Sequence, residues 1–142
     1  MSGRIDGVRA IRACVRAGSN LVGEPSAALV RASALERVGD FHGEYVIDLD
    51  MWFRLLHHSA LYFIDEPLCS FRISGASWSG RLAHAQGTQL RRLYREERER
   101  SPDLVTRADV AVGNVQAEIM RYKRRLAYSY VNLRARLNAR RR

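Results

Sequence analysis

Two acidic residues at the start of an apolar segment are the strongest candidates for chemistry in this sequence. Asp48 and Asp50 are one residue apart, and the apolar residues beside them recur at helical spacing: Leu49, Trp52, Phe53 and Leu56. We expect a helix with a buried apolar face and an acidic, outward-pointing N-terminus. Asp48 could act there as a general base, because a rigid element would hold its carboxylate in place. It could equally serve only as the helix cap, which accepts from the free N–H groups of the first turn.

The remaining titratable residues show no spacing typical of a catalytic or metal site. Cys14 and Cys69 are far apart and form no CxxC pattern, so we expect buried thiols in a reducing compartment. His57 and His58 come at the end of the expected helix, where histidine interacts favourably with the helix dipole. We therefore expect no metal on this chain.

The chain is strongly basic. Its 142 residues include 24 Lys and Arg against 15 Asp and Glu, which gives a net charge of +9. Such an excess favours an anionic partner such as nucleic acid, an acidic membrane surface or a phosphorylated substrate. No apolar run is long enough to span a membrane, and the N-terminus lacks the apolar core of a signal peptide. We therefore expect a cytoplasmic protein.

The elements that must position these residues alternate between helices and short strands over residues 1–80. Apolar periodicity predicts a helix over 4–17 that ends at Gly18, and a capping-box pattern at Ser33 and Glu36 predicts a short helix that stops at Gly39. The acidic helix follows and runs to about residue 58. Short apolar runs predict three strands, at 27–30, 61–64 and 68–73.

Residues 81–142 form a second region, a basic and helical extension. We predict a charge-rich helix over 81–100, a break at 101–103 and one long helix over 105–139. The long helix carries a stripe of apolar residues spaced by three or four: Val112, Val115, Ile119, Tyr122, Leu126, Tyr130, Leu133 and Leu137. This stripe could pair with a second copy of the chain, lie against residues 1–80, or bind an acidic membrane surface. The basic face could also be simply solvated.

Four segments in residues 4–80 resemble, in order and separation, the C-terminal half of the catalytic domain in family 2 glycosyltransferases. These inverting enzymes have a nucleotide-sugar-binding GT-A fold, and the matching segments are 20–31, 34–41, 47–55 and 64–72. The resemblance implies an α/β fold, a partial Rossmann-like GT-A domain with few short strands over 1–80, followed by the helical extension over 81–142.

The resemblance also implies roles for individual residues. The acidic motif of the family falls on Asp48, which would deprotonate the acceptor hydroxyl as that hydroxyl attacks the anomeric carbon. The family often has Glu directly before this Asp, where this chain has Ile47. Acceptor or supporting roles carry over to four residues: Glu24, Asp50, Arg54 and Arg72. The family often has His at the position of Ser74, so no metal ligand is expected there.

The donor-binding half of the family has no counterpart in this sequence. Asp48 and Asp50 have the spacing of the Asp-x-Asp metal motif, but their context matches the later acidic motif, and there is no Gly-rich phosphate loop. We therefore expect a truncated or split glycosyltransferase that is inactive alone and needs a donor-half chain as partner. Mg²⁺ or Mn²⁺ with a nucleotide sugar is implied for the complete enzyme, and no cofactor on this chain.

A second hypothesis makes the chain a non-catalytic module. The basic amphipathic helix would then mediate homo-oligomerisation or bind an anionic membrane surface, which would place the cytoplasmic protein peripherally at the inner face of the membrane. Nucleic acid is not expected as a partner. The positive charge is the only feature that favours nucleic-acid binding, and the sequence contains no recognisable nucleic-acid-binding motif.

Overall fold

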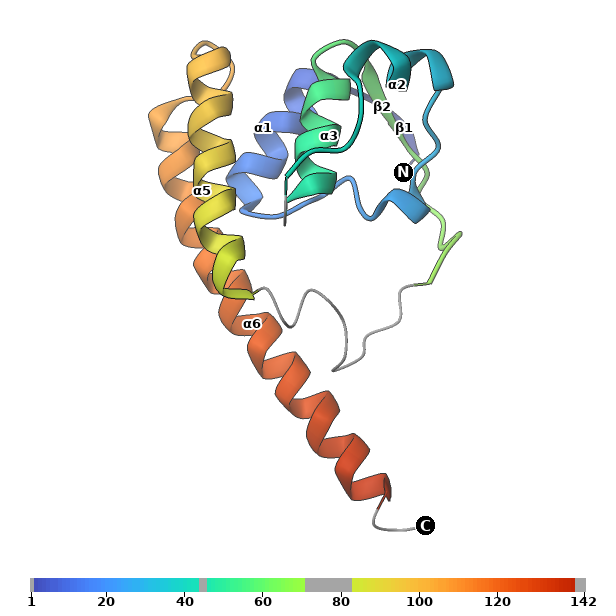
Figure 1. Cartoon of the computed structure of the whole chain (residues 1–142), viewed down its shortest axis with the longest axis vertical. Coiled ribbons are helices and arrows are strands. Elements are labelled where there is room, and N and C mark those ends of the chain that lie inside the picture. The colour runs from blue at the N-terminus through green and yellow to red at the C-terminus, as the bar shows by residue number, and fades with distance from the viewer. Residues whose placement is uncertain (1, 44–45, 71–82, 140–142) are drawn as a thin grey trace.

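The computed structural model of the chain describes residues 2–43, 46–70 and 83–139. The fold is mixed α/β and mostly helical, and Figure 1 shows the long C-terminal helix projecting beyond the other elements. In chain order the elements are β1 (Gly3–Asp6), α1 (Gly7–Ala17), a 3₁₀ turn (Pro25–Ala27), α2 (Ala32–Val38), α3 (Ile47–Leu56), β2 (Ala60–Phe63), α5 (Ala83–Arg100) and α6 (Arg107–Ala139).

The described strands form one two-stranded antiparallel sheet. Gly3 pairs with Phe63 and Asp6 pairs with Ala60, so the start of the chain lies along the segment after α3. The prediction of a helix from residue 4 was wrong at its start. Asp6 caps α1 by accepting from the Arg9 N–H at 3.2 Å, and the residues before this cap take the extended conformation that β2 can pair.

The core lies where α1 and α3 pack together and against α5 and α6. It draws on both regions that the sequence divides at residue 80: Ala10, Ile11, Cys14, Val15, Leu49, Met51, Trp52, Phe53, Leu55, Leu56, Leu90, Leu93, Tyr94 and Val105. The predicted apolar face of α3 is confirmed, because Leu49, Trp52, Phe53 and Leu56 are all buried. The helices predicted over 81–100 and 105–139 are also confirmed as α5 and α6.

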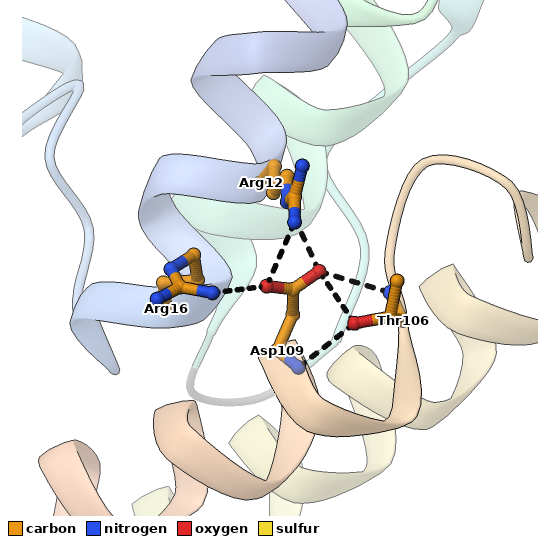
Figure 2. Close-up of polar contacts among 4 residues, drawn as sticks. All are labelled: Arg12, Arg16, Thr106 and Asp109. Atoms are coloured by element: carbon orange, nitrogen blue, oxygen red, sulfur yellow. Dashed lines mark hydrogen bonds and ion pairs between the residues drawn. The ribbon is translucent and has the colours of Figure 1, made fainter.

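A buried carboxylate joins the first helix to the last. Asp109, in the first turn of α6, is fully buried and accepts from Arg12 Nε at 3.0 Å and from Arg16 Nη1 at 2.6 Å (Figure 2). It also accepts from the N–H and hydroxyl of Thr106 at 3.0 and 2.8 Å, while the Asp109 N–H donates back to that hydroxyl. One side chain therefore caps α6 and fixes α1 against it.

Glycines let α1 and α6 approach closely beside this cluster. A Cβ atom on Gly113 would overlap the carbonyl oxygen of Val15, and one on Gly18 would overlap the backbone of Ala117. Gly18 also has φ of +61° and ends α1 in the left-handed conformation, as the sequence predicted. The contact between the two helices therefore depends on backbone atoms that cannot move aside.

A second polar contact joins α3 to α5. Glu97 is buried, and its Oε1 lies 2.8 Å from Nε2 of His57, the residue that ends α3. Arg100 lies further away, with its Nη1 at 3.8 Å from Oε2 of Glu97. His57 therefore lies at the end of α3, as predicted, and its ring also contacts another helix.

Several local predictions were wrong. Residues 27–30 form no strand; Pro25 starts a 3₁₀ turn, and the side chain of Leu29 is fully exposed. The capping box predicted at Ser33 does not form, because α2 begins one residue earlier and has no side-chain cap. Residues 68–70 are not a strand, and the remainder of that predicted strand lies outside the described residues. Cys69 is exposed, whereas Cys14 is buried as predicted.

Candidate functional site

The carboxyl groups of Glu24 and Asp48 meet at the surface of the chain. They come from two different segments, the turn that precedes Pro25 and the first turn of α3, and they lie close enough for Asp48 to act on the ionisation of Glu24. Arg124 of α6 is near enough for its charge to act on Glu24. Two acidic side chains and one guanidinium group, from three elements, therefore form the candidate site.

A network around Asn20 fixes the position of Glu24. The Asn20 side chain accepts from the N–H groups of Val22 and Gly23, both at 3.0 Å, and donates to the Gly23 carbonyl at 2.9 Å. The indole Nε1 of Trp52 donates to the same carbonyl at 2.9 Å. The residue before Glu24 is therefore bound to α3, the helix that carries Asp48. The helical spacing in the sequence placed Trp52 on the buried apolar face of this helix, and nothing in the sequence indicated this bond.

Asp48 is not the cap of α3. The helix begins at Ile47, its N-cap residue is Val46, and no side chain caps it. The capping interpretation of Asp48 was therefore wrong. The half-buried carboxylate of Asp48 does not cap the helix and lies near Glu24.

The contact between the two carboxyl groups changes the ionisation of Glu24. Burial, the charge of Asp48 and the hydrogen bond to Asp48 raise the pKa of Glu24, while the charge of Arg124 acts in the opposite direction. A neighbouring carboxylate disfavours ionisation of a carboxyl group. Glu24 therefore keeps its proton to a higher pH than a free glutamate side chain does.

The other predicted site residues lie apart from this pair. Asp50 accepts from Arg54 Nε at 2.9 Å, and the same guanidinium donates to the carbonyls of Val38 and Asp40 at 2.6 and 2.8 Å. Asp50 and Arg54 therefore tie α3 to the end of α2. Arg72 lies outside the described residues.

Replacing Glu24 by Gln is expected to raise the melting temperature at pH 7. A raised pKa means that folding favours protonated Glu24, so its stabilising contribution is present below the ordinary pKa and is lost as pH rises. Ionised Glu24 opposes folding at pH 7, by up to about 1 kcal/mol for a surface group. Thermal unfolding followed by circular dichroism should show this gain at pH 7 and little gain at pH 4. Glu36→Gln, at an exposed position of α2, is the matched control; an equal gain there would contradict the coupling.

Among the described residues, no group of three or more His, Cys, Asp or Glu side chains could hold a metal ion. No helix in the described ranges is both long and apolar enough to cross a membrane. Comparisons with protein-family models, with curated proteins and with solved structures found no match. The glycosyltransferase resemblance therefore stays a prediction from the residues.

Proposed function

We propose that this chain is the acceptor-side part of an inverting glycosyltransferase and that Asp48 is its catalytic base. The paired carboxyl groups of Glu24 and Asp48 are the observation that supports this most directly. Two of the four segments with the resemblance, 20–31 and 47–55, supply one of these acidic residues each. Their meeting at one point of the surface is what an acceptor site would need.

The chemistry follows from the pair. In an inverting transfer, an ionised carboxylate removes the proton of the acceptor hydroxyl as the hydroxyl oxygen attacks the anomeric carbon and the nucleotide leaves. Asp48 is the base, and Glu24 is the neighbouring carboxyl group that orients it. No step is assigned to a metal on this chain. A partner chain would bind the nucleotide sugar.

Nuclear magnetic resonance offers a direct test of the acceptor site. The indole N–H of Trp52 is a reporter, because it binds the carbonyl next to Glu24. We expect millimolar disaccharide, from a panel of hexose disaccharides, to shift the Trp52 indole resonance of the full chain. Asp48→Asn and Glu24→Gln should each abolish the shift, whereas Asp40→Asn, at an exposed position, should leave it intact.

Two results would contradict the proposal: no disaccharide shifts the resonance, or the shift survives in both site variants. Calorimetric titration with a panel of nucleotide sugars and Mn²⁺ provides a second criterion. We expect no heat of binding, and clear binding of a nucleotide sugar would overturn the assignment to the acceptor side.

A specific observation on α6 supports a second function, binding to an anionic membrane surface. Six residues of the predicted stripe have exposed side chains, with exposed fractions from 39% to 72%: Val112, Val115, Ile119, Tyr122, Leu126 and Tyr130. The stripe therefore does not pack on the rest of the described chain. Such a continuous apolar face on one helix is typical of a binding surface.

Charge favours a lipid surface over a second copy of the chain. Lys123 directly follows Tyr122, and Arg125 directly precedes Leu126, so helix geometry places them on opposite sides of the stripe. Two copies packed along this stripe would bring basic flanks together in either orientation. Anionic headgroups would instead neutralise both flanks, at about 1 kcal/mol per basic residue near the surface.

Vesicle sedimentation tests this function. We expect the chain to pellet with vesicles of phosphatidylcholine and phosphatidylglycerol but weakly with phosphatidylcholine alone. Leu126→Gln should weaken partitioning about tenfold, since burying a leucine contributes roughly 1.5–3 kcal/mol. Leu29→Gln, at a fully exposed leucine away from α6, should have little effect. A concentration-dependent dimer in analytical ultracentrifugation, lost in Leu126→Gln, would instead show that a second copy covers the stripe.

A further inference from the structure

A cleft between α5 and α6 collects four arginines. Its volume is about 210 Å³, and its lining consists of Arg91, Arg95, Arg98, Arg107, Val110 and Asn114. The three α5 arginines are spaced by four and three residues, so they share one face of that helix. Arg107 is the first residue of α6, and Asn114 follows it by seven residues, about two turns later. We call this the arginine cleft.

Most of the positive charge in the arginine cleft is unbalanced. Arg91 forms an ion pair with Glu118 at 3.1 Å. Within the described residues, Arg95, Arg98 and Arg107 have no carboxylate partner. Guanidinium groups that converge in this way repel one another, and a cleft lined by one sign of charge attracts counter-ions. The arrangement therefore favours a bound anion.

Asn114 narrows the chemistry of that anion. Its Oδ1 is buried and has no hydrogen-bond partner within the described chain. A buried acceptor without a partner costs about 1–3 kcal/mol, so a donor from a ligand would be stabilising. Arginine recognises phosphate oxygens through paired N–H groups. At roughly 30 Å³ per water molecule, the cleft also has room for more than one inorganic phosphate.

We propose that the arginine cleft binds a phosphate ester that carries a hydroxyl group. The arginines bind the phosphate oxygens, and a ligand hydroxyl donates to Asn114 Oδ1. This site is separate from the carboxyl pair, because Asn114 and Arg124 are ten residues apart on α6, about 15 Å along the helix. The proposal does not depend on the glycosyltransferase assignment. The phosphate ester could be a free sugar phosphate or the headgroup of a phosphorylated lipid.

Calorimetric titration of the full chain with glucose 6-phosphate tests the cleft, with glucose and inorganic phosphate as partial probes. We expect glucose 6-phosphate to bind at least threefold more tightly than inorganic phosphate, and glucose not to bind. The double variant Arg95→Gln/Arg107→Gln should weaken binding at least tenfold. Arg31→Gln/Arg37→Gln removes the same charge from the exposed surface around α2 and should change affinity less than twofold. Asn114→Ala should bring the affinity for glucose 6-phosphate down to that for inorganic phosphate.

Vesicle binding and the control variant show which form of phosphate ester binds and whether the arginine cleft is the site. Flotation with phosphatidylcholine vesicles, with and without phosphatidylinositol 4-phosphate, shows whether the chain binds the phosphorylated lipid. The site is supported if the cleft variant loses binding to these vesicles or to glucose 6-phosphate. Equal losses of binding in the cleft and control variants would show diffuse charge attraction and overturn the proposal. Absence of binding to both glucose 6-phosphate and the phosphorylated lipid would also overturn it. The cleft variant should remain folded, because neither Arg95 nor Arg107 forms an ion pair or hydrogen bond within the part of the chain that the structure describes. If thermal unfolding shows otherwise, Arg95→Gln alone must reproduce the weakening.

Discussion

Asp109→Asn is expected to lower the free energy of unfolding by about 3 kcal/mol, the lower end of the range for a broken buried ion pair. Burial alone would raise the pKa of Asp109. Hydrogen bonds from the Thr106 N–H, Arg16, the Thr106 hydroxyl and Arg12 outweigh it and hold that pKa well below its usual range. Asn keeps the shape but not the charge, so both guanidinium groups lose their counter-ion. The arginine side chains are half exposed, which limits the loss. Urea denaturation at pH 7 measures it.

Acidification gives an independent check on Asp109. Its folded-state pKa is lowered, so the stabilisation it provides is fully present above the ordinary value of 3.8 and is lost as pH falls below that value. The difference in stability between wild type and Asp109→Asn should therefore shrink as pH falls from 5 towards 2. Asp103→Asn, at an exposed position in the preceding loop, should stay within about 0.5 kcal/mol of wild type. An equally small effect of Asp109→Asn would refute the role of the cluster.

Gly113→Ala is expected to destabilise the chain by about 1–3 kcal/mol or more, although the same change usually strengthens a helix. The added Cβ would overlap the Val15 carbonyl oxygen, a backbone atom held within α1. Relief requires α1 and α6 to separate, which would also stretch the bonds of Asp109. The midpoint of urea unfolding should fall accordingly.

Gly87→Ala is the matched control for this prediction. Gly87 lies inside α5, and a Cβ there would meet its nearest atoms at 3.6 Å or more, an ordinary contact. The usual helix preference should then dominate and stabilise the chain by about 0.5–1 kcal/mol. Opposite signs at the two glycines are the expected result. Stabilisation at both would mean that α1 and α6 do not approach as described.

Local patterns predicted the helices well, because their signals lie within each helix. The Gly18 stop, the apolar face of α3 and the extents of α5 and α6 all follow from spacing and helix-ending residues. The failed prediction at the start of α1 depends on a distant partner. Residues 3–6 form a strand because β2 pairs with them from 54 or more residues away, which no short window of sequence contains.

The same distinction applies to the sites. Glu24 and Asp48 could be identified individually, but their contact depends on Asn20 and Trp52 holding one turn against α3. The Asp109 cluster did leave a local signal. Thr106 and Asp109 have the spacing of a capping box, which marks the start of α6. Which arginines would reach that carboxylate is a property of helix packing, and residues 12 and 16 gave no indication of it.

The pairing of α1 with α6 has a consequence for synthesis of the chain. Ile11, Cys14 and Val15 are translated well before α6, which begins at Arg107 and packs on α1. α3 can cover part of α1 earlier, but the side of α1 that faces α6 stays uncovered until α6 has been translated. Contacts between such distant segments form late and slow folding. Products of premature termination before α6 would keep that surface uncovered, which makes them natural clients for chaperones and proteases.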